Sequence, residues 1–332
     1  MSRRLLIPIL LLAAAFVVPG QTSHAQHENY TLRIATLAPQ GSTWMRIFNA
    51  WNNSLRQRTD GRLTLQFYPG GSQGDERDFI RKMRAGQMDG AVVTSTGLGQ
   101  IVRPVMVLAV PGIFREYSQL DRVRHRFQHQ FEQQFEAHGY HLLGWGDAGK
   151  LRLFSKTEIR RPSDLRSVRP WAWRDDTVFT EFLNVVGANP VRLGVPEVYP
   201  ALQTGMVDTV PSSALAAVAL QWYTRLHYVT AQNMGILIGA AVLKKEKYDA
   251  LPDDLRTALD ETSTQAHRAL RRAVRRDDER AYATIQRRGI TAVDISANEA
   301  EWAQAAATTR EHLAGRLYPR SLLERVTAAA GQ

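Results

Sequence analysis

The chain has 332 residues, of which 44% are hydrophobic and 22% are charged, so it can bury a large core and form two domains. It contains no cysteine, which excludes disulfides, thiolate metal sites and cysteine nucleophiles. The formal net charge of +10 is compatible with nucleic-acid binding, but the late arginine cluster is mixed with acids and lacks interleaved aromatic residues. This pattern favours a solvated helix face, and we expect no nucleic-acid partner.

The N-terminus has the pattern of a secretory signal. Arg3 and Arg4 precede an uncharged run, residues 5–18, that is too short to span a membrane comfortably, and Ala25 ends a small-residue cleavage motif. We expect residues 1–25 to be removed on export, which would lower the formal net charge from +10 to +8. The alternative is that this N-terminal segment is not cleaved and anchors the protein in the membrane. No later segment is long and apolar enough to cross a bilayer, so we expect a soluble mature protein.

The first part of the mature chain has a β-α-β-α-β pattern. Strands are predicted at 31–37, 63–67 and 88–94, with helices between them that end at Gly61 and Gly86. This order predicts a parallel sheet with right-handed crossovers, in which a ligand lies at the carboxyl ends of the strands. Candidate ligand-binding residues at these ends are Ala38, Asp75 and Thr94.

The rest of the chain continues as alternating strands and helices. After a helix at about 119–138, strands are predicted at 141–147, 151–154 and 168–173, followed by helices that end at Gly187 and near Gly205. A return strand, IGAAVLKK, precedes a long helix with Pro252 in its first turn and one buried stripe, and Gly289 ends it. A short strand at 290–293 and terminal helices complete the chain.

Two motifs invite other interpretations. Gly70–Gly74 fits G-x-S-x-G between a strand and a helix, which would make Ser72 the nucleophile of a periplasmic serine hydrolase. No HGGG-like loop precedes it and Pro69 interrupts the strand, so a glycine-rich turn is the preferred interpretation. His125 and His129 could share a helix face as metal ligands, but Arg126 stands where a zinc protease needs glutamate. We therefore expect no enzyme, no metal site and no cofactor.

Several motifs together resemble one family. The order APQGSTW, PGGSQG, PSDL, GANP, EVYPALQTG-VD and LPDDL is similar to that of the solute-binding proteins of tripartite ATP-independent periplasmic (TRAP) transporters, the C4-dicarboxylate-binding type. The similarity extends from Thr31 to the terminal helices. It implies an α/β, two-lobed periplasmic-binding-protein (type II) fold. Each lobe would be a mainly parallel sheet flanked by helices, with a long helix bridging the lobes.

The resemblance also implies a domain organisation and partners. We expect residues 1–25 to be the signal peptide, 26–148 plus about 238–277 to form lobe I, and about 149–237 plus 278–332 to form lobe II. The clamp would close on a small molecule in the periplasm and deliver it to small and large integral membrane subunits. An additional periplasmic adaptor is a further candidate partner. A lipid carrier or sensor that has lost its membrane partner is another interpretation.

The family's ligand-gripping residues are replaced in this chain. The strand arginine that binds the ligand carboxylate in the family corresponds to Trp171, and a second arginine, in G-x-R, corresponds to Leu151. The family's asparagine after VDGQE corresponds to Ser212. Trp173 would add apolar surface, and Val195, beside PEVYPALQTG, belongs to the same candidate set.

These replacements predict a neutral or largely apolar ligand. A carboxylate enclosed without a cationic partner loses hydration at a cost of about a few kcal/mol. The alternative is an organic acid held by a displaced arginine, because a one-residue slip would turn Arg152 or Arg169 inward.

Overall fold

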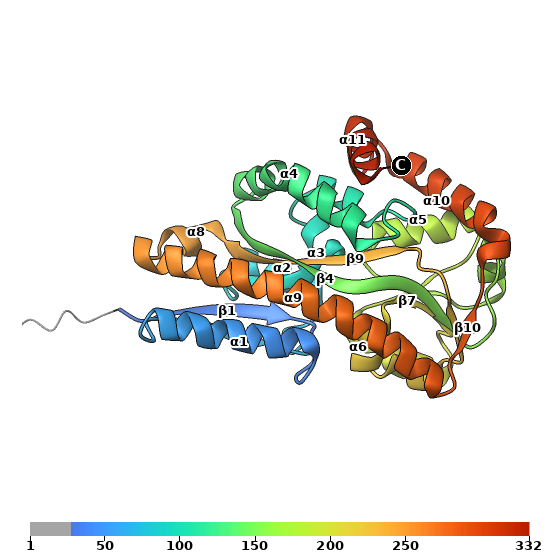
Figure 1. The fold of residues 1–332 in the computed structure, drawn as a ribbon, viewed down its shortest axis with the longest axis horizontal. Helices are drawn as coiled ribbons and strands as arrows, with labels where there is room; N and C mark the ends of the chain where they lie inside the picture. The colour runs from blue at the N-terminus through green and yellow to red at the C-terminus, as the bar shows by residue number, and fades with distance from the viewer. Residues whose placement is uncertain (1–27, 332) are drawn as a thin grey trace, which may run out of the picture.

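The computed structural model describes residues 28–331, which form two α/β lobes joined by long elements that cross from one to the other (Figure 1). This confirms the two-lobed α/β fold. The predicted signal peptide and its cleavage site lie outside the described residues. No helix within residues 28–331 has the length and apolar character needed to cross a membrane.

The described residues form one eight-stranded sheet and one separate two-stranded sheet. The large sheet has the order β10-β8-β4-β9-β3-β1-β2, and β7 also pairs with β4. Its strands are β1 (Tyr30–Thr36), β2 (Leu63–Tyr68), β3 (Gly90–Thr94), β4 (Tyr140–Ser155), β7 (Thr209–Ser212), β8 (Tyr228–Thr230), β9 (Gly235–Lys244) and β10 (Thr291–Val293). The small sheet pairs β5 (Trp171–Trp173) with β6 (Val191–Leu193) in parallel.

Strand directions in the large sheet are mixed, whereas the sequence predicted mainly parallel sheets. β1 is parallel to β2 and β3, as predicted for the first part of the chain. β9 is antiparallel to both β3 and β4, and β4 is antiparallel to β7 and β8. The reason is that the chain leaves lobe I along β4 and returns along its neighbour β9, so the two crossing strands must run in opposite directions.

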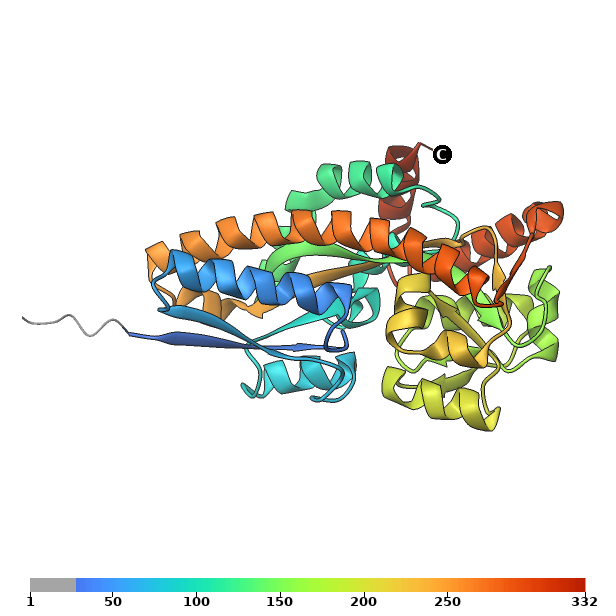
Figure 2. The same cartoon turned by 60° about the horizontal axis from the view of Figure 1, so that its bottom comes forward.

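Helices cover both sides of this sheet (Figures 1 and 2). The longer helices are α1 (Thr43–Arg58), α2 (Glu76–Arg84), α4 (Tyr117–Ala137), α5 (Thr177–Val186), α6 (Val195–Thr204), α7 (Ala214–Ala219), α9 (Asp253–Arg287), α10 (Glu299–Leu313) and α11 (Arg320–Ala330). The shortest are α3 (Ser95–Gly99) and α8 (Lys245–Asp249), with 3-10 segments η1 (Arg103–Ala109), η2 (Pro162–Ser167), η3 (Trp222–Arg225) and η4 (Ser296–Asn298). Gly187 and Gly205 end α5 and α6 with φ of 75° and 76°, as the sequence predicted.

The helix α9 runs along both lobes (Figure 2). Its 35 residues correspond to about 52 Å. The predicted apolar stripe is buried along the helix, from Leu255 to Ile285. Pro252 lies at the N-cap, one position before the first turn. A single continuous helix therefore packs against lobe I with its N-terminal part and against lobe II with its C-terminal part.

Asp278 of α9 binds the backbone of β4 at the point where this strand passes from one lobe to the other. Its buried carboxylate accepts hydrogen bonds from the backbone N–H of Lys150 and of Leu215, each at 2.9 Å. Gly149 has φ of 116°, and a β-carbon there would lie 2.5 Å from Ser213 Cβ and 2.7 Å from Asp278 Oδ1. Only glycine fits this close approach between β4, α7 and α9.

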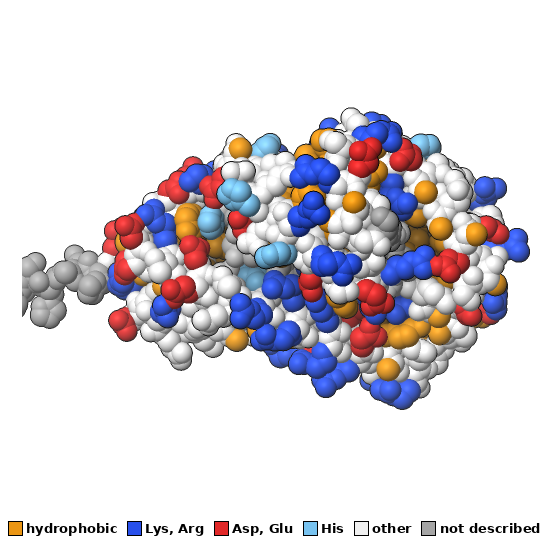
Figure 3. Space-filling view, turned by 45° about the horizontal axis from the view of Figure 1, so that its top comes forward, with side chains coloured by type: hydrophobic (Ala, Val, Ile, Leu, Met, Phe, Trp, Pro, Cys, Tyr) orange, Lys and Arg blue, Asp and Glu red, His pale blue; other side chains and the backbone are white. Residues whose placement is uncertain are grey.

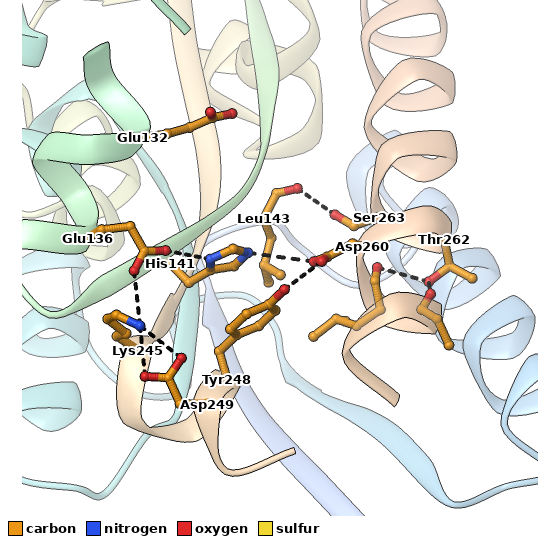
Figure 4. Close-up of polar contacts among 12 residues, drawn as sticks. Glu132, Glu136, His141, Leu143, Lys245, Tyr248, Asp249, Asp260, Thr262 and Ser263 are labelled. Carbon is orange, nitrogen blue, oxygen red and sulfur yellow. Dashed lines mark hydrogen bonds and ion pairs between the residues drawn. The ribbon is translucent and has the colours of Figure 1, made fainter. Parts of the chain in front are cut away.

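A second polar cluster joins α4, β4, α8 and α9 at the outer end of lobe I (Figure 4). His141 Nδ1 lies 2.6 Å from Glu136 Oε1, and the imidazole stacks on Tyr248 with ring centroids 3.7 Å apart. Tyr248 donates its hydroxyl hydrogen to Asp260 at 2.5 Å. These contacts link α4, β4, α8 and α9. They lie near the N-terminal end of α9, whereas Asp278 lies 18 residues further along the helix.

Candidate ligand-binding site

A cavity lies between the lobes, where the carboxyl ends of β1 and β3 face β5, α5 and α6. The cavity has a volume of about 210 Å³, which is enough for a small organic molecule. Lobe I contributes a wall that includes Ala38, Thr94 and Phe48. The facing wall includes Trp171 and Phe179. The position agrees with the rule that ligands bind beyond the carboxyl ends of parallel strands.

Indole rings form much of the cavity wall, and three of the four that the described residues contribute, Trp44, Trp171 and Trp173, already donate their N–H groups to protein acceptors. Trp171 Nε1 donates to the carbonyl of Leu193 at 3.0 Å, and Trp44 Nε1 donates to the carbonyl of Asp147 at 3.2 Å. Trp171 also packs edge-on against Trp222, with ring centroids 5.2 Å apart. Because protein acceptors take these donors, the rings present mainly carbon surface to the cavity.

The ionisable side chains that residues 28–331 contribute to the cavity lining are three acids and one histidine. Among the described residues the lining contains Glu76, Asp147 and Asp176 and no lysine or arginine. The Asp147 carboxylate is compensated, since it pairs with Arg124 and with Arg275 Nε at 2.7 Å. The two other carboxylates have no cationic side chain within ion-pair distance among the described residues.

Backbone groups hold those two carboxylates. Glu76 accepts hydrogen bonds from the N–H of Thr94 at 2.6 Å and of Gly97 at 2.7 Å, and burial raises its pKa to about 8. Asp176 caps α5 by accepting from the N–H of Val178 at 2.9 Å, and burial raises its pKa. Neither group offers positive charge to a ligand, so an anionic ligand would gain no charge partner here.

His267 of α9 contributes a neutral acceptor to the lining. Its Nδ1 lies 2.8 Å from the carbonyl oxygen of Ser263, so Nδ1 carries the proton. Burial lowers its pKa to about 4, which keeps the imidazole neutral at physiological pH. Nε2 is buried and has no hydrogen-bond partner among the described residues.

Seven of the ten candidate ligand-binding residues line the cavity. They are Ala38, Thr94, Leu151, Trp171, Trp173, Val195 and Ser212. Asp75 lies outside the lining, and its Oδ2 accepts hydrogen bonds from Trp173 Nε1 and from the backbone N–H of Val195, each at 2.9 Å. The role of all ten residues in binding stays a prediction.

The two arginines of the organic-acid alternative do not reach the cavity lining. Arg152 is buried elsewhere, where it donates to the carbonyls of Thr230 and Ala231 and lies over the Tyr282 ring, 4.0 Å from its centroid. Arg169 is exposed and pairs with Asp208 at 3.1 Å. Each guanidinium therefore already has partners away from the cavity.

The other two motifs do not form sites. Ser72 is exposed in its turn, and no hydrogen bond of the described residues joins its hydroxyl to a histidine. His125 and His129 are exposed on α4, and residues 28–331 contain no group of three or more His, Cys, Asp or Glu side chains that could hold a metal ion.

Several residues that line the cavity were not predicted from the sequence. Phe179 and Phe182 of α5, Trp222 of η3 and His267 of α9 all line the cavity. The aromatic residues of α5 follow the PWAW strand closely and could have been suspected. Trp222 and His267 carry no local signal, since only the tertiary fold brings η3 and α9 to the cavity.

Two α/β lobes that enclose a cavity between them are the architecture of periplasmic solute-binding proteins. Residues 34–313 match the family described as bacterial extracellular solute-binding protein, family 7, and the chain belongs to this family. The C4-dicarboxylate-binding periplasmic protein DctP of Rhodobacter capsulatus is 23% identical over 263 residues, 78% of this chain and 79% of that protein. The 2,3-diketo-L-gulonate-binding periplasmic protein YiaO of Escherichia coli is 21% identical and covers 73% of this chain and 74% of its own length.

Solved structures of the same fold contain bound acids. A TRAP periplasmic solute-binding protein from Roseobacter denitrificans, with bound β-D-glucuronate, superposes with a TM-score of 0.84 at 22% identity and covers 90% of this chain and 99% of its own. The sugar acid binding protein DctPAm from Advenella mimigardefordensis, in complex with galactonate, gives a TM-score of 0.86 at 17% identity and covers 92% and 98%. At these identities the likeness establishes the fold.

Proposed function

We propose that this TRAP-type solute-binding protein captures a small molecule that is neutral or largely apolar, and delivers it to a membrane permease made of a small and a large integral subunit. The observation that carries the ligand class is the cavity lining, which among the described residues holds indole and phenyl rings, three acids and no lysine or arginine. A carboxylate enclosed there would lose its hydration and find no cationic partner, at a cost of about a few kcal/mol.

The organic-acid alternative has support of a different kind. The two relatives described above are named for binding C4-dicarboxylates and 2,3-diketo-L-gulonate, and the two solved structures contain β-D-glucuronate and galactonate. An acid could bind here only if its charge were met by backbone N–H groups or by an arginine that leaves its present partners. The lining of this chain weighs more in our proposal than the ligands of relatives about 20% identical to it.

One experiment separates the two ligand classes. Molecules released by denaturing the purified mature protein are identified by mass spectrometry, and binding is then measured by calorimetry with succinate, D-glucuronate, a 2-oxoacid and the neutral compounds identified. We expect neutral, largely apolar molecules and no measurable heat with the acids. Tight binding of any of these acids would exclude the apolar-ligand proposal and leave the family assignment intact.

We also infer that the lobe limits predicted from the sequence, near residues 148, 238 and 277, mark the segments that bend when the clamp opens. In support, the pairing of β4 with β9 is irregular between Asp147 and Gly149. Gly149 there has a positive φ, and Asp278 holds the adjacent backbone. Hydrogen exchange with and without ligand would test this inference, because the bending segments should change protection while β1 and β2 do not.

A further inference from the structure

The exposed face of α9 carries a row of arginines. Arg268, Arg272, Arg276 and Arg280 are spaced by four residues, and Arg287 continues the row seven residues after Arg280. Residues four apart lie on one face of a helix, so these five side chains form a stripe about 28 Å long. All five are exposed. We call them the α9 arginine stripe, and Figure 3 shows Lys and Arg side chains gathered near the middle of one face of the molecule.

The positive charge of the stripe is poorly compensated. Asp277 lies 3.0 Å from Arg276 and 3.7 Å from Arg280, and the same carboxylate also lies 3.5 Å from Arg46 of α1. No ion pair of the described residues involves Arg268, Arg272 or Arg287. Like charges at this spacing destabilise a helix slightly, and among the described residues only Asp277 offsets part of this energetic cost by an ion pair.

The stripe lacks the features of a specific protein interface. Such interfaces are centred on buried aromatic or aliphatic anchors. The exposed large hydrophobic side chain among the described residues is Met206, which lies between α6 and β7 and not on α9. A row of guanidinium groups without an apolar anchor suits a surface with many phosphates, because each guanidinium can donate two parallel hydrogen bonds to one phosphate.

We propose that the α9 arginine stripe holds the protein against an anionic lipid surface. The proposal does not depend on the identity of the ligand. It uses the family's delivery of ligand to a membrane permease only as the reason that a lipid surface lies within reach. Weak electrostatic attachment would keep the protein close to the bilayer and allow it to diffuse laterally. Because α9 crosses both lobes, attachment through it would also fix the orientation of the clamp on the surface (Figure 2).

The test is co-sedimentation of the mature protein with vesicles. We expect binding to vesicles of phosphatidylcholine mixed with phosphatidylglycerol and none to pure phosphatidylcholine. Salt should release the protein, because screening shortens the range of surface charges to about 10 Å at 0.1 M. The variant Arg268→Gln/Arg272→Gln/Arg276→Gln should lower the partition coefficient at least about tenfold, since each basic residue near an anionic surface contributes appreciably to attachment.

A matched control removes the same charge elsewhere. Arg84, Arg103 and Arg192 are exposed, lie outside α9 and have no ion pair among the described residues. Their replacement by glutamine should leave vesicle binding nearly unchanged. An equal loss of vesicle binding in both triple variants would mean that net charge alone drives attachment, and this would overturn the role of the stripe. Absence of binding of the wild type to the anionic vesicles would also overturn the proposal. Capture of purified permease in lipid-free detergent, lost in the stripe variant alone, would assign the stripe to a protein partner and also overturn it.

Ligand binding by these variants is measured separately. Calorimetry with the ligand released from the wild-type protein should be unaffected, because no stripe residue lines the cavity. Failure of the lipid proposal and failure of the proposed ligand class would therefore give different results.

Discussion

Asp75 of lobe I accepts a hydrogen bond from the indole N–H of Trp173 of lobe II at 2.9 Å. The same carboxylate oxygen accepts from the backbone N–H of Val195 at 2.9 Å, at the start of α6. Asp75 also caps α2, by accepting from the N–H of Glu76 at 2.7 Å. With the proposed lobe limits, the acceptor and these two donors belong to different lobes, so the proposed opening of the clamp would separate them. The bond between Asp75 and Trp173 is therefore expected to stabilise the closed form.

Trp173→Phe should favour the open form. The change removes one hydrogen bond to a partly buried carboxylate and leaves the cap of α2 intact. Hydrogen bonds to charged groups contribute about 1.5–3 kcal/mol, so the ratio of closed to open molecules should fall about tenfold or more. Small-angle scattering would show a larger radius of gyration in the variant, and the affinity for ligand should fall by up to the same factor.

Trp302→Phe is the control for this prediction. Trp302 donates its indole N–H to the carbonyl of Arg160 at 2.9 Å, and both residues lie in the predicted lobe II. Loss of this bond should lower thermal stability without a change in the scattering radius. If the two variants opened to the same extent, the hydrogen bond of Trp173 would have no special part in closure.

The sequence identified where Asp75 would lie and missed what it does. Its position after a strand of a β-α-β pattern correctly predicted the carboxyl edge of the sheet, which follows from local periodicity and handedness. Its partners come from residues about 100 positions later, and no local pattern encodes that pairing. The same limit applies to Arg152, because its place over Tyr282 depends on the packing of β4 against α9.

Trp171→Arg should give the protein affinity for a carboxylate. The sequence resemblance predicts that this position corresponds to the family arginine that binds the ligand carboxylate, and Trp171 lines the cavity. A guanidinium there would supply the cationic partner that the lining lacks, and it should bring D-glucuronate binding into the measurable range by calorimetry. Removing the indole also leaves the Leu193 carbonyl without its donor, so some loss of thermal stability is expected.

The control is Trp171→Phe, which removes the indole without adding charge. This variant should bind neutral compounds more weakly than the wild type and should still give no measurable binding heat with organic acids. Binding of D-glucuronate by the wild type, or by the phenylalanine variant as well, would show that the charge at this position does not decide the ligand class.

Asp278→Ala should destabilise the protein as a whole. The change leaves the N–H groups of Lys150 and Leu215 without their buried acceptor, and each lost partner costs about 1–3 kcal/mol. A drop in denaturation midpoint with an unchanged slope would be the expected result. Glu279→Ala is the neighbouring control, since that carboxylate is half exposed and pairs with Lys150 Nζ at 2.9 Å, so its loss should change stability by less than about 1 kcal/mol.

Glu76 and Asp176 line the cavity, but they were not predicted as site residues from the sequence. Both lie near motifs that the sequence singled out, PGGSQG and PWAW, yet neither was named. An acid in the first turn or at the N-cap of a helix is ordinary, because it compensates the helix dipole. What makes these two part of the site is burial beside an apolar cavity, which depends on how the lobes close.

His141 should make stability depend on pH in the neutral range. Burial lowers its pKa, but hydrogen bonds with Asp260 and Glu136 outweigh this effect, and the net result is a raised pKa. A raised pKa in the folded state means that the contribution is complete below the unfolded value of about 6.5 and is lost as pH rises through the folded value. His141→Phe keeps the ring that stacks on Tyr248 and removes the titration. The stability difference between wild type and variant should shrink from pH 6 to pH 9, and a difference that grew with pH would contradict the geometry of the cluster in Figure 4.

His267 should have the opposite dependence. Burial lowers its pKa to about 4, so the unfolded chain binds a proton between pH 6.5 and 4 that the folded chain does not. Stability must then fall as pH falls through this window, by up to about 3 kcal/mol, since each pKa unit corresponds to about 1.4 kcal/mol. His267→Phe should lack this acid sensitivity, and urea denaturation of both proteins at several pH values from 7 to 4 would measure it. Because Nδ1 donates to Ser263 and Nε2 is buried without a partner, protonation has no acceptor to receive the new hydrogen. Equal slopes for the two proteins would mean that a group outside residues 28–331, water or the ligand supplies that acceptor.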